Sequence, residues 1–241
     1  LDILNPKMLA IIGDSFATID SRYPQERPWQ HQVAAGLQCD FKTYARTSSD
    51  NLYIHAQLDY VLEEVNPDFI VVWLTCPQRL SFPINIDTDL PYAAHHVKNK
   101  QSEYEIAHHY GAEEVYDSDS YSNLMAHIEN HGANRKNTAI RDYFEYVYGQ
   151  QIGLYLKSKL INSMIKDIEL VNIPTIFIEP QYFRQYNHSN NIGFVTDMDL
   201  TPEYFPGESQ MINHMKAEVH KKVSDRILLE FSKLQKRASV K

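Results

Sequence analysis

Three short apolar runs constrain the fold of this chain more than any other feature. Runs this short that are apolar throughout are typical of strands buried on both faces, as in parallel sheets. Between the first two runs, a helical pattern, a short strand pattern and a second helical pattern follow one another. The predicted order is therefore β-α-β-α-β, which requires right-handed crossovers and a parallel sheet. The apolar runs are Leu9–Ile12, Phe69–Leu74 and Ile173–Ile178, and the segments between the first two are Trp29–Leu37, Gln38–Ala45 and Leu52–Val65.

The rest of the chain gives weaker signals. Residues 83–137 have no clean period and carry several histidines, so we interpret them as an insertion or lid. Residues 139–171 predict one or two long helices, residues 181–199 a loop, and Glu208 to Leu234 the last helix. Ser49 or Asp50 is expected to cap the second helix, and Asn66-Pro67 to end it. We therefore expect one α/β domain over residues 1–241.

Composition excludes some classes of protein. The net charge of −8 argues against a general nucleic-acid binder, which needs a basic face. No run of 18 apolar residues is present, and the first residues lack the pattern of a secretory signal. The two cysteines, Cys39 and Cys76, do not suggest a disulfide scaffold. We expect a cytoplasmic protein that binds neither nucleic acid nor membranes.

A Gly-Asp-Ser turn follows the first apolar run. In open α/β sheets, functional residues gather at the carboxyl ends of the strands. Gly13 permits a sharp backbone reversal, and Ser15 would lie near free N–H groups that can stabilise an oxyanion. Asp14 is expected to cap the turn or orient Ser15. The alternative is an ordinary strand-ending turn without chemistry.

These residues resemble the SGNH/GDSL hydrolase superfamily, in a divergent branch common in bacteriophages. Gly13-Asp14-Ser15-Phe16 matches the first block, the nucleophile loop. The polar turn Thr47-Ser48-Ser49-Asp50-Asn51 stands where the second block belongs. Trp73 to Arg79, followed by Phe82, is similar to the third block of that branch, and Asp142 to Tyr148 also resembles it. The resemblance covers residues 8–82 and 139–234.

The resemblance implies a three-layer α/β/α, flavodoxin-like sheet and a serine hydrolase without a cofactor. Its substrate would be a small-molecule or carbohydrate ester, such as an O-acetyl group. Ser15 would attack the carbonyl carbon while a histidine takes its proton. The oxyanion would be held by the Ser15 N–H, an N–H near Ser48 and a side chain near Thr75. Arg79 would hold substrate or a loop carboxylate, or else form a buried structural ion pair.

Departures from the superfamily pattern concern the catalytic residues. The expected histidine position is occupied by Phe205 in one alignment and by Asp199 in another. His214, in the predicted last helix, is the replacement base that we consider. The second block lacks its glycine and the third its asparagine. The alternative is a catalytically inactive SGNH-fold binding or structural protein, which would belong to a phage particle or phage-encoded complex.

The histidines of the insertion permit a third hypothesis. His127 and His131 are spaced i, i+4, and the pairs His95-His96 and His108-His109 could complete a zinc site. No cysteine or carboxylate stands at a recognised spacing with them. We therefore expect no metal, and interpret the insertion as a solvated polar segment, a lid or an oligomer contact. The sequence leaves the oligomeric state open.

Overall fold

The computed structural model describes residues 7–19, 28–46, 49–75, 150–179, 186–196, 215 and 217–239. The predicted insertion over 83–137 lies outside these residues, with all six of its histidines considered above. Ser48, Arg79 and His214 also lie outside them, so their proposed roles stay predictions.

The core of the molecule is a five-stranded sheet in which every pair of neighbouring strands is parallel. The strand order is β2-β1-β3-β4-β5, which is the order of flavodoxin-like folds. The predicted fold class is thereby confirmed. The strands are β1 (Met8–Ile12), β2 (Asp40–Thr43), β3 (Phe69–Trp73), β4 (Thr175–Ile178) and β5 (Ile192–Val195).

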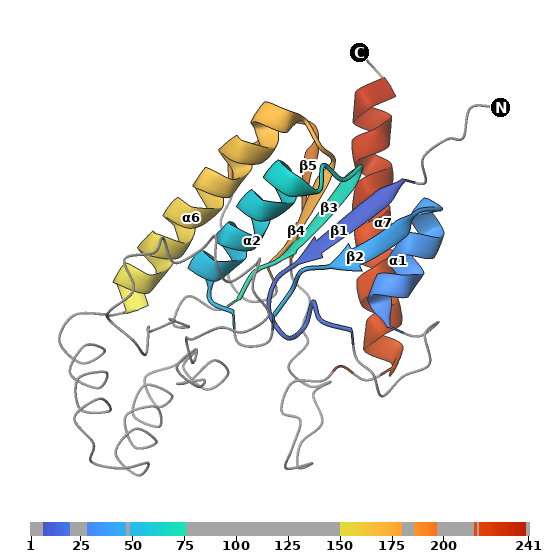
Figure 1. Cartoon of the computed structure of the whole chain (residues 1–241), viewed down its shortest axis with the longest axis horizontal. Coiled ribbons are helices and arrows are strands. Elements are labelled where there is room, and N and C mark those ends of the chain that lie inside the picture. Colours follow the sequence, from blue (N-terminus) through green and yellow to red (C-terminus); the bar gives the residue numbers. More distant parts are fainter. Residues whose placement is uncertain are drawn as a thin grey trace, which may run out of the picture.

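Helices cover both faces of the sheet (Figure 1). Alternate residues of β1 and β3 pack on opposite layers, because successive side chains of a strand point to opposite faces. Leu9, Ile11 and Val71 join the cluster formed with α1 and α7, whereas Ile12 and Val72 join the cluster formed with α2 and α6. The helices are α1 (Trp29–Leu37), α2 (Asn51–Glu64), α6 (Gln150–Val171) and α7 (Ala217–Ser239). None of these helices is long and apolar enough to cross a membrane.

Local signals explain where α2 begins and ends. The Asp50 carboxylate accepts a hydrogen bond from the Tyr53 N–H at 2.7 Å, which confirms Asp50 as the N-cap. The Ser49 hydroxyl instead donates to the carbonyl of Arg46. After the helix, Asn66 adopts a left-handed backbone with φ +48° immediately before Pro67. The N-terminal half of α2 lies at the carboxyl edge of the sheet, where Asn51 binds the backbone of Thr75 and Gln57 binds that of Gly13.

Two predicted boundaries were wrong. Residues 181–199 were expected to be a loop, but they contain β5, which pairs with β4. This strand has only four residues and a central Gly193, so its sequence pattern does not stand out. The last helix begins at Ala217 rather than Glu208, since Met215 is buried but not helical, and it continues to Ser239.

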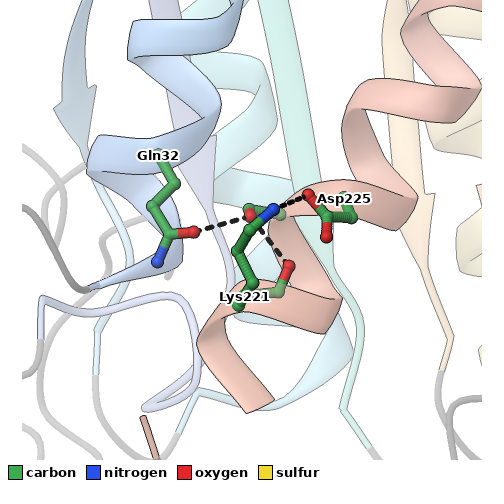
Figure 2. Close-up of polar contacts among 4 residues, drawn as sticks. Gln32, Lys221 and Asp225 are labelled. Atoms are coloured by element: carbon green, nitrogen blue, oxygen red, sulfur yellow. Dashed lines mark hydrogen bonds and ion pairs between the residues drawn. The ribbon is translucent and has the colours of Figure 1, made fainter. Parts of the chain in front are cut away.

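A buried serine joins α1 to α7. The Ser224 Oγ lies 2.9 Å from Gln32 Oε1 and 2.9 Å from the carbonyl oxygen of Lys221 (Figure 2). On the exposed side, Lys221 forms an ion pair with Asp225, one turn further along α7. Ser224 is 1% exposed, so its single hydroxyl proton needs an acceptor within the protein, and these two oxygens lie within reach. The hydrogen bond between Ser224 and Gln32 helps to set which residues of the two helices lie opposite each other.

Cys39, after α1, is expected to react slowly with alkylating reagents. Burial, followed by the nearby carboxylates of Asp40 and Asp68, raises the pKa of its thiol to about 11. Since only the thiolate reacts, alkylation by iodoacetamide at pH 8 should be roughly 100-fold slower than in the unfolded chain. The rate should then rise as the pH approaches the raised pKa. Mass spectrometry of the Cys39 peptide measures this separately from Cys76, and equal rates in buffer and in urea would contradict it.

Candidate active site

The turn after β1 depends on a glycine that nothing else can replace without strain. Gly13 has φ +145°, a backbone conformation that residues with a Cβ rarely adopt. An added Cβ would also lie 2.7 Å from both the Cβ and the carbonyl oxygen of Trp73. The chain therefore crosses the end of β3 in close contact before it reverses direction. This close approach brings Ser15 to the carboxyl edge of the sheet.

Asp14 closes the turn around Ser15. Its buried carboxylate accepts a hydrogen bond from the Phe16 N–H at 3.0 Å, and its carbonyl accepts one from the Ala17 N–H at 3.1 Å. The Phe16 ring stacks on Trp73, with 5.6 Å between ring centroids. Asp14 thus has the turn-capping contact expected from the sequence.

Ser15 has polar groups that nothing in the described part of the chain uses. Its Oγ is buried from solvent and has no hydrogen-bond partner. Among the described residues its N–H donates to none either, whereas its carbonyl accepts a bond from Thr18 Oγ1 at 2.6 Å. Buried polar groups without partners are rare and costly, and each calls for an explanation. Here a hydroxyl and an N–H of one residue both lack a hydrogen-bond partner among the described residues.

Two buried side-chain amides of α2 bind the backbone at the ends of β1 and β3. Gln57 Oε1 accepts from the Gly13 N–H at 2.7 Å, and its Nε2 donates to the Gly13 carbonyl at 3.2 Å and to Ser49 Oγ at 3.1 Å. Asn51 makes the same paired contact with Thr75, and both of its hydrogen bonds measure 3.1 Å. Each amide continues the hydrogen bonding of the sheet beyond its edge. Sequence reasoning missed these roles; the available signal was a polar residue on the apolar face of α2.

Thr75 follows β3 at the carboxyl edge of the sheet, where its backbone is bound by Asn51 of α2. It is 5% exposed, and its backbone N–H is already bound to Asn51. Only its side chain therefore remains as the oxyanion donor that was proposed, a role that stays a prediction.

No histidine in the described residues forms a hydrogen bond with Ser15. His220, in the first turn of α7, is 2% exposed, and its Nδ1 accepts a hydrogen bond from the Trp29 N–H at 3.3 Å. An acceptor at Nδ1 leaves the proton of a neutral imidazole on Nε2. In the neutral ring Nε2 therefore carries the proton, which is the wrong state for a base that takes the proton of a serine. Sequence reasoning passed over this residue, six positions after His214.

One group in the described part of the chain has ligand atoms close enough to share a metal ion. His55 Nε2 of α2 lies 3.1 Å from Asp167 Oδ2 of α6 and 3.6 Å from Asp59 Oδ1. Burial raises the pKa of Asp59; His55 opposes this, while Asp167 and Glu63 add to it. A hydrogen bond between the His55 ring and the Asp167 carboxylate satisfies this contact without an ion. We therefore interpret the group as a polar connection between the two helices.

A buried ion pair lies at the same edge of the sheet as Ser15. Glu179 follows β4 directly and is 1% exposed, and its Oε1 lies 2.9 Å from Nζ of Lys157, a residue of α6 that is 5% exposed. The Glu179 N–H donates to the carbonyl of Val195 at 3.0 Å, which fixes its backbone to β5. Sequence reasoning missed this pair, although a carboxylate directly after a buried strand was a usable signal.

Comparisons with known proteins found similarity only at the level of solved structures. The sequence matches no family model and no curated protein. One similar structure is described as a lipolytic protein of the G-D-S-L family from Desulfitobacterium hafniense DCB-2. It is 14% identical with a TM-score of 0.46, over 93% of this chain and 99% of that one. Another is the salicylyl-acyltransferase SsfX3 from a tetracycline biosynthetic pathway, which is 8% identical with a TM-score of 0.46. That alignment covers 97% of this chain but 57% of the acyltransferase.

Proposed function

We propose that this protein is a serine hydrolase of the SGNH/GDSL type that cleaves ester bonds, with Ser15 as its nucleophile. The observation that carries the proposal is the unused hydroxyl and N–H of Ser15, in a strained turn at the carboxyl edge of a parallel sheet. Enzymes place a nucleophile beside an N–H that can receive developing negative charge. The sequence resemblance to the superfamily supports the same assignment of Ser15.

The proposed reaction has two steps. The Ser15 Oγ bonds to the ester carbonyl carbon while a base removes its proton, and the negative charge that develops on the carbonyl oxygen faces the Ser15 N–H. The carbon–oxygen bond to the alcohol then breaks, and the base returns the proton to the alcohol. Water next attacks the acyl-serine, which releases the acid and restores the hydroxyl. We propose His214 as the base and the Thr75 side chain as a second oxyanion donor.

The proposed substrates are small-molecule or carbohydrate esters, O-acetyl groups among them, as the family resemblance implies. We infer a cytoplasmic location, or a phage particle if a phage encodes the protein.

A second candidate function is a binding or structural role for an SGNH-like fold that has lost its base. Ser15 favours it in one respect, because no described histidine forms a hydrogen bond with its hydroxyl. A serine hydroxyl is a weak nucleophile unless a neighbouring group activates it.

The substitution Ser15→Ala separates the two functions. With p-nitrophenyl acetate, we expect wild-type hydrolysis to exceed that of Ser15→Ala by at least about 10³-fold. A fluorophosphonate probe should label wild type at Ser15 and leave the variant unlabelled. His214→Ala should lower the rate without changing the circular dichroism spectrum. Equal background rates in wild type and Ser15→Ala, with no labelling of either, would support the binding or structural role instead.

A further inference from the structure

The turn that carries Ser15 is held at both ends by buried glutamine amides from opposite layers of the fold. Gln57 of α2 binds both the N–H and the carbonyl of Gly13, before the serine. Gln30 of α1 donates from Nε2 to the carbonyls of Ala17 and Thr18, after the serine, at 3.3 and 2.8 Å. Both glutamine side chains are fully buried, with 0% exposure. The turn is thus fixed between the helix layers that lie on either face of the sheet (Figure 1).

We propose that Gln57 and Gln30 are positioning residues for the nucleophile, an inference that rests on the proposed function. Neither amide forms a hydrogen bond with Ser15. Each acts through the backbone, so that the N–H and Oγ of Ser15 keep one orientation and stay free of other partners. An oxyanion donor is effective because it is oriented before the reaction, and a misplacement of about 1 Å can cost about 100-fold in rate.

The hydrogen bonds of Gln30 indicate that this residue does more than stabilise the folded protein. Its Oε1 is buried and has no hydrogen-bond partner in the described part of the chain, a state that costs free energy. An apolar side chain of similar shape would remove that cost. The carbonyl of Ala17 would still accept a bond from Thr43 Oγ1 at 3.1 Å. What such a replacement loses is the direct connection between α1 and the turn.

The test compares Gln30→Met and Gln57→Met with Gln32→Met. Gln32 is the matched control because it also lies on α1, and its side chain accepts a hydrogen bond from Ser224 of α7. For the first two variants, we expect kcat on p-nitrophenyl acetate and the rate of fluorophosphonate labelling to fall about 10- to 100-fold, with KM changed less than about threefold. Gln32→Met should keep the wild-type kcat. Gln30→Met should also keep nearly wild-type thermal stability, so it decides the question if Gln57→Met does not fold.

Two outcomes separate this proposal from the proposed function. If wild type is active and both variants keep its kcat, the positioning role is wrong and the hydrolase assignment stands. If wild type neither hydrolyses esters nor reacts with the probe, the hydrolase assignment fails. Hydrogen exchange of the backbone amides over residues 13–18 then tests whether Gln30 holds the turn in one conformation. Faster exchange in Gln30→Met than in Gln32→Met supports it, and equal exchange in the two overturns it.

Discussion

Replacing Gly13 with alanine is expected to lower the free energy of unfolding by about 3 kcal/mol or more. The backbone at φ +145° disfavours any residue with a Cβ, and the new methyl would meet Trp73 at 2.7 Å. One of the two contacts is the carbonyl oxygen of Trp73 at the end of a central strand, which cannot rotate away as a side chain can. Thermal unfolding should show a melting temperature lower by roughly 6–12 °C.

Gly36→Ala provides the matched control for this substitution. An added Cβ there would also make a short contact, 2.6 Å, but with the end of the flexible Leu228 side chain. Gly36 lies within α1, where alanine gains about 1 kcal/mol of helix propensity over glycine. We therefore expect the stability of Gly36→Ala to stay within about 1 kcal/mol of wild type. Equal losses from the two substitutions would mean that the turn at Gly13 can relax to accept a Cβ, which would contradict the expected strain.

The second large effect is expected at the buried ion pair. Lys157→Met should destabilise the protein by about 3–5 kcal/mol, because it removes the cation from a carboxylate, Glu179, that is 1% exposed. Desolvating a charge is affordable only when a partner compensates for it. Chemical denaturation of wild type and variant at neutral pH measures the difference.

The double variant Lys157→Met with Glu179→Leu tests the physical reason. If the buried carboxylate that has lost its Lys157 partner causes the loss, removing that carboxylate should restore much of the stability, since apolar pairs often replace buried ion pairs at little cost. A double variant that is no more stable than Lys157→Met would instead indicate that packing around Lys157 causes the loss. Hydrolase activity, measured on both variants, reports separately whether this edge of the sheet also contributes to the site.

The sequence predicted those parts of the fold that short stretches determine by themselves. The buried runs that became β1, β3 and β4 are mostly apolar, and α1 has the bounds that its apolar spacing predicted, Trp29–Leu37. The strand β5 was missed because four residues with a central glycine carry almost no pattern. Its strand character comes from pairing with β4, a tertiary contact that propensity cannot report.

The same distinction applies to the candidate site. The Gly13-Asp14-Ser15 turn is local, so its residue types indicated both a sharp turn and a hydroxyl just beyond the strand end. The amide contacts are not local: Gln57 reaches Gly13 across 44 positions of sequence. From sequence alone, a glutamine in a helix is predicted to lie at the surface, because the packing of the helix is not yet known. For the same reason, the sequence did not predict that Lys157 pairs with Glu179, because the two residues belong to different parts of the fold.

Successive residues of β1 and β3 pack into two different hydrophobic clusters, so each of these residues is constrained by only one layer of helices. Ile70 contacts the layer of α2 and α6, and its neighbour Val71 that of α1 and α7. A change of volume at one of them can be compensated among helix residues that the other does not touch. Substitutions within one layer should therefore be energetically coupled, while substitutions in different layers should come closer to additive. The sequences of the two helical layers can therefore diverge independently. The central strands pack against both layers, so their sequences have the least freedom to vary.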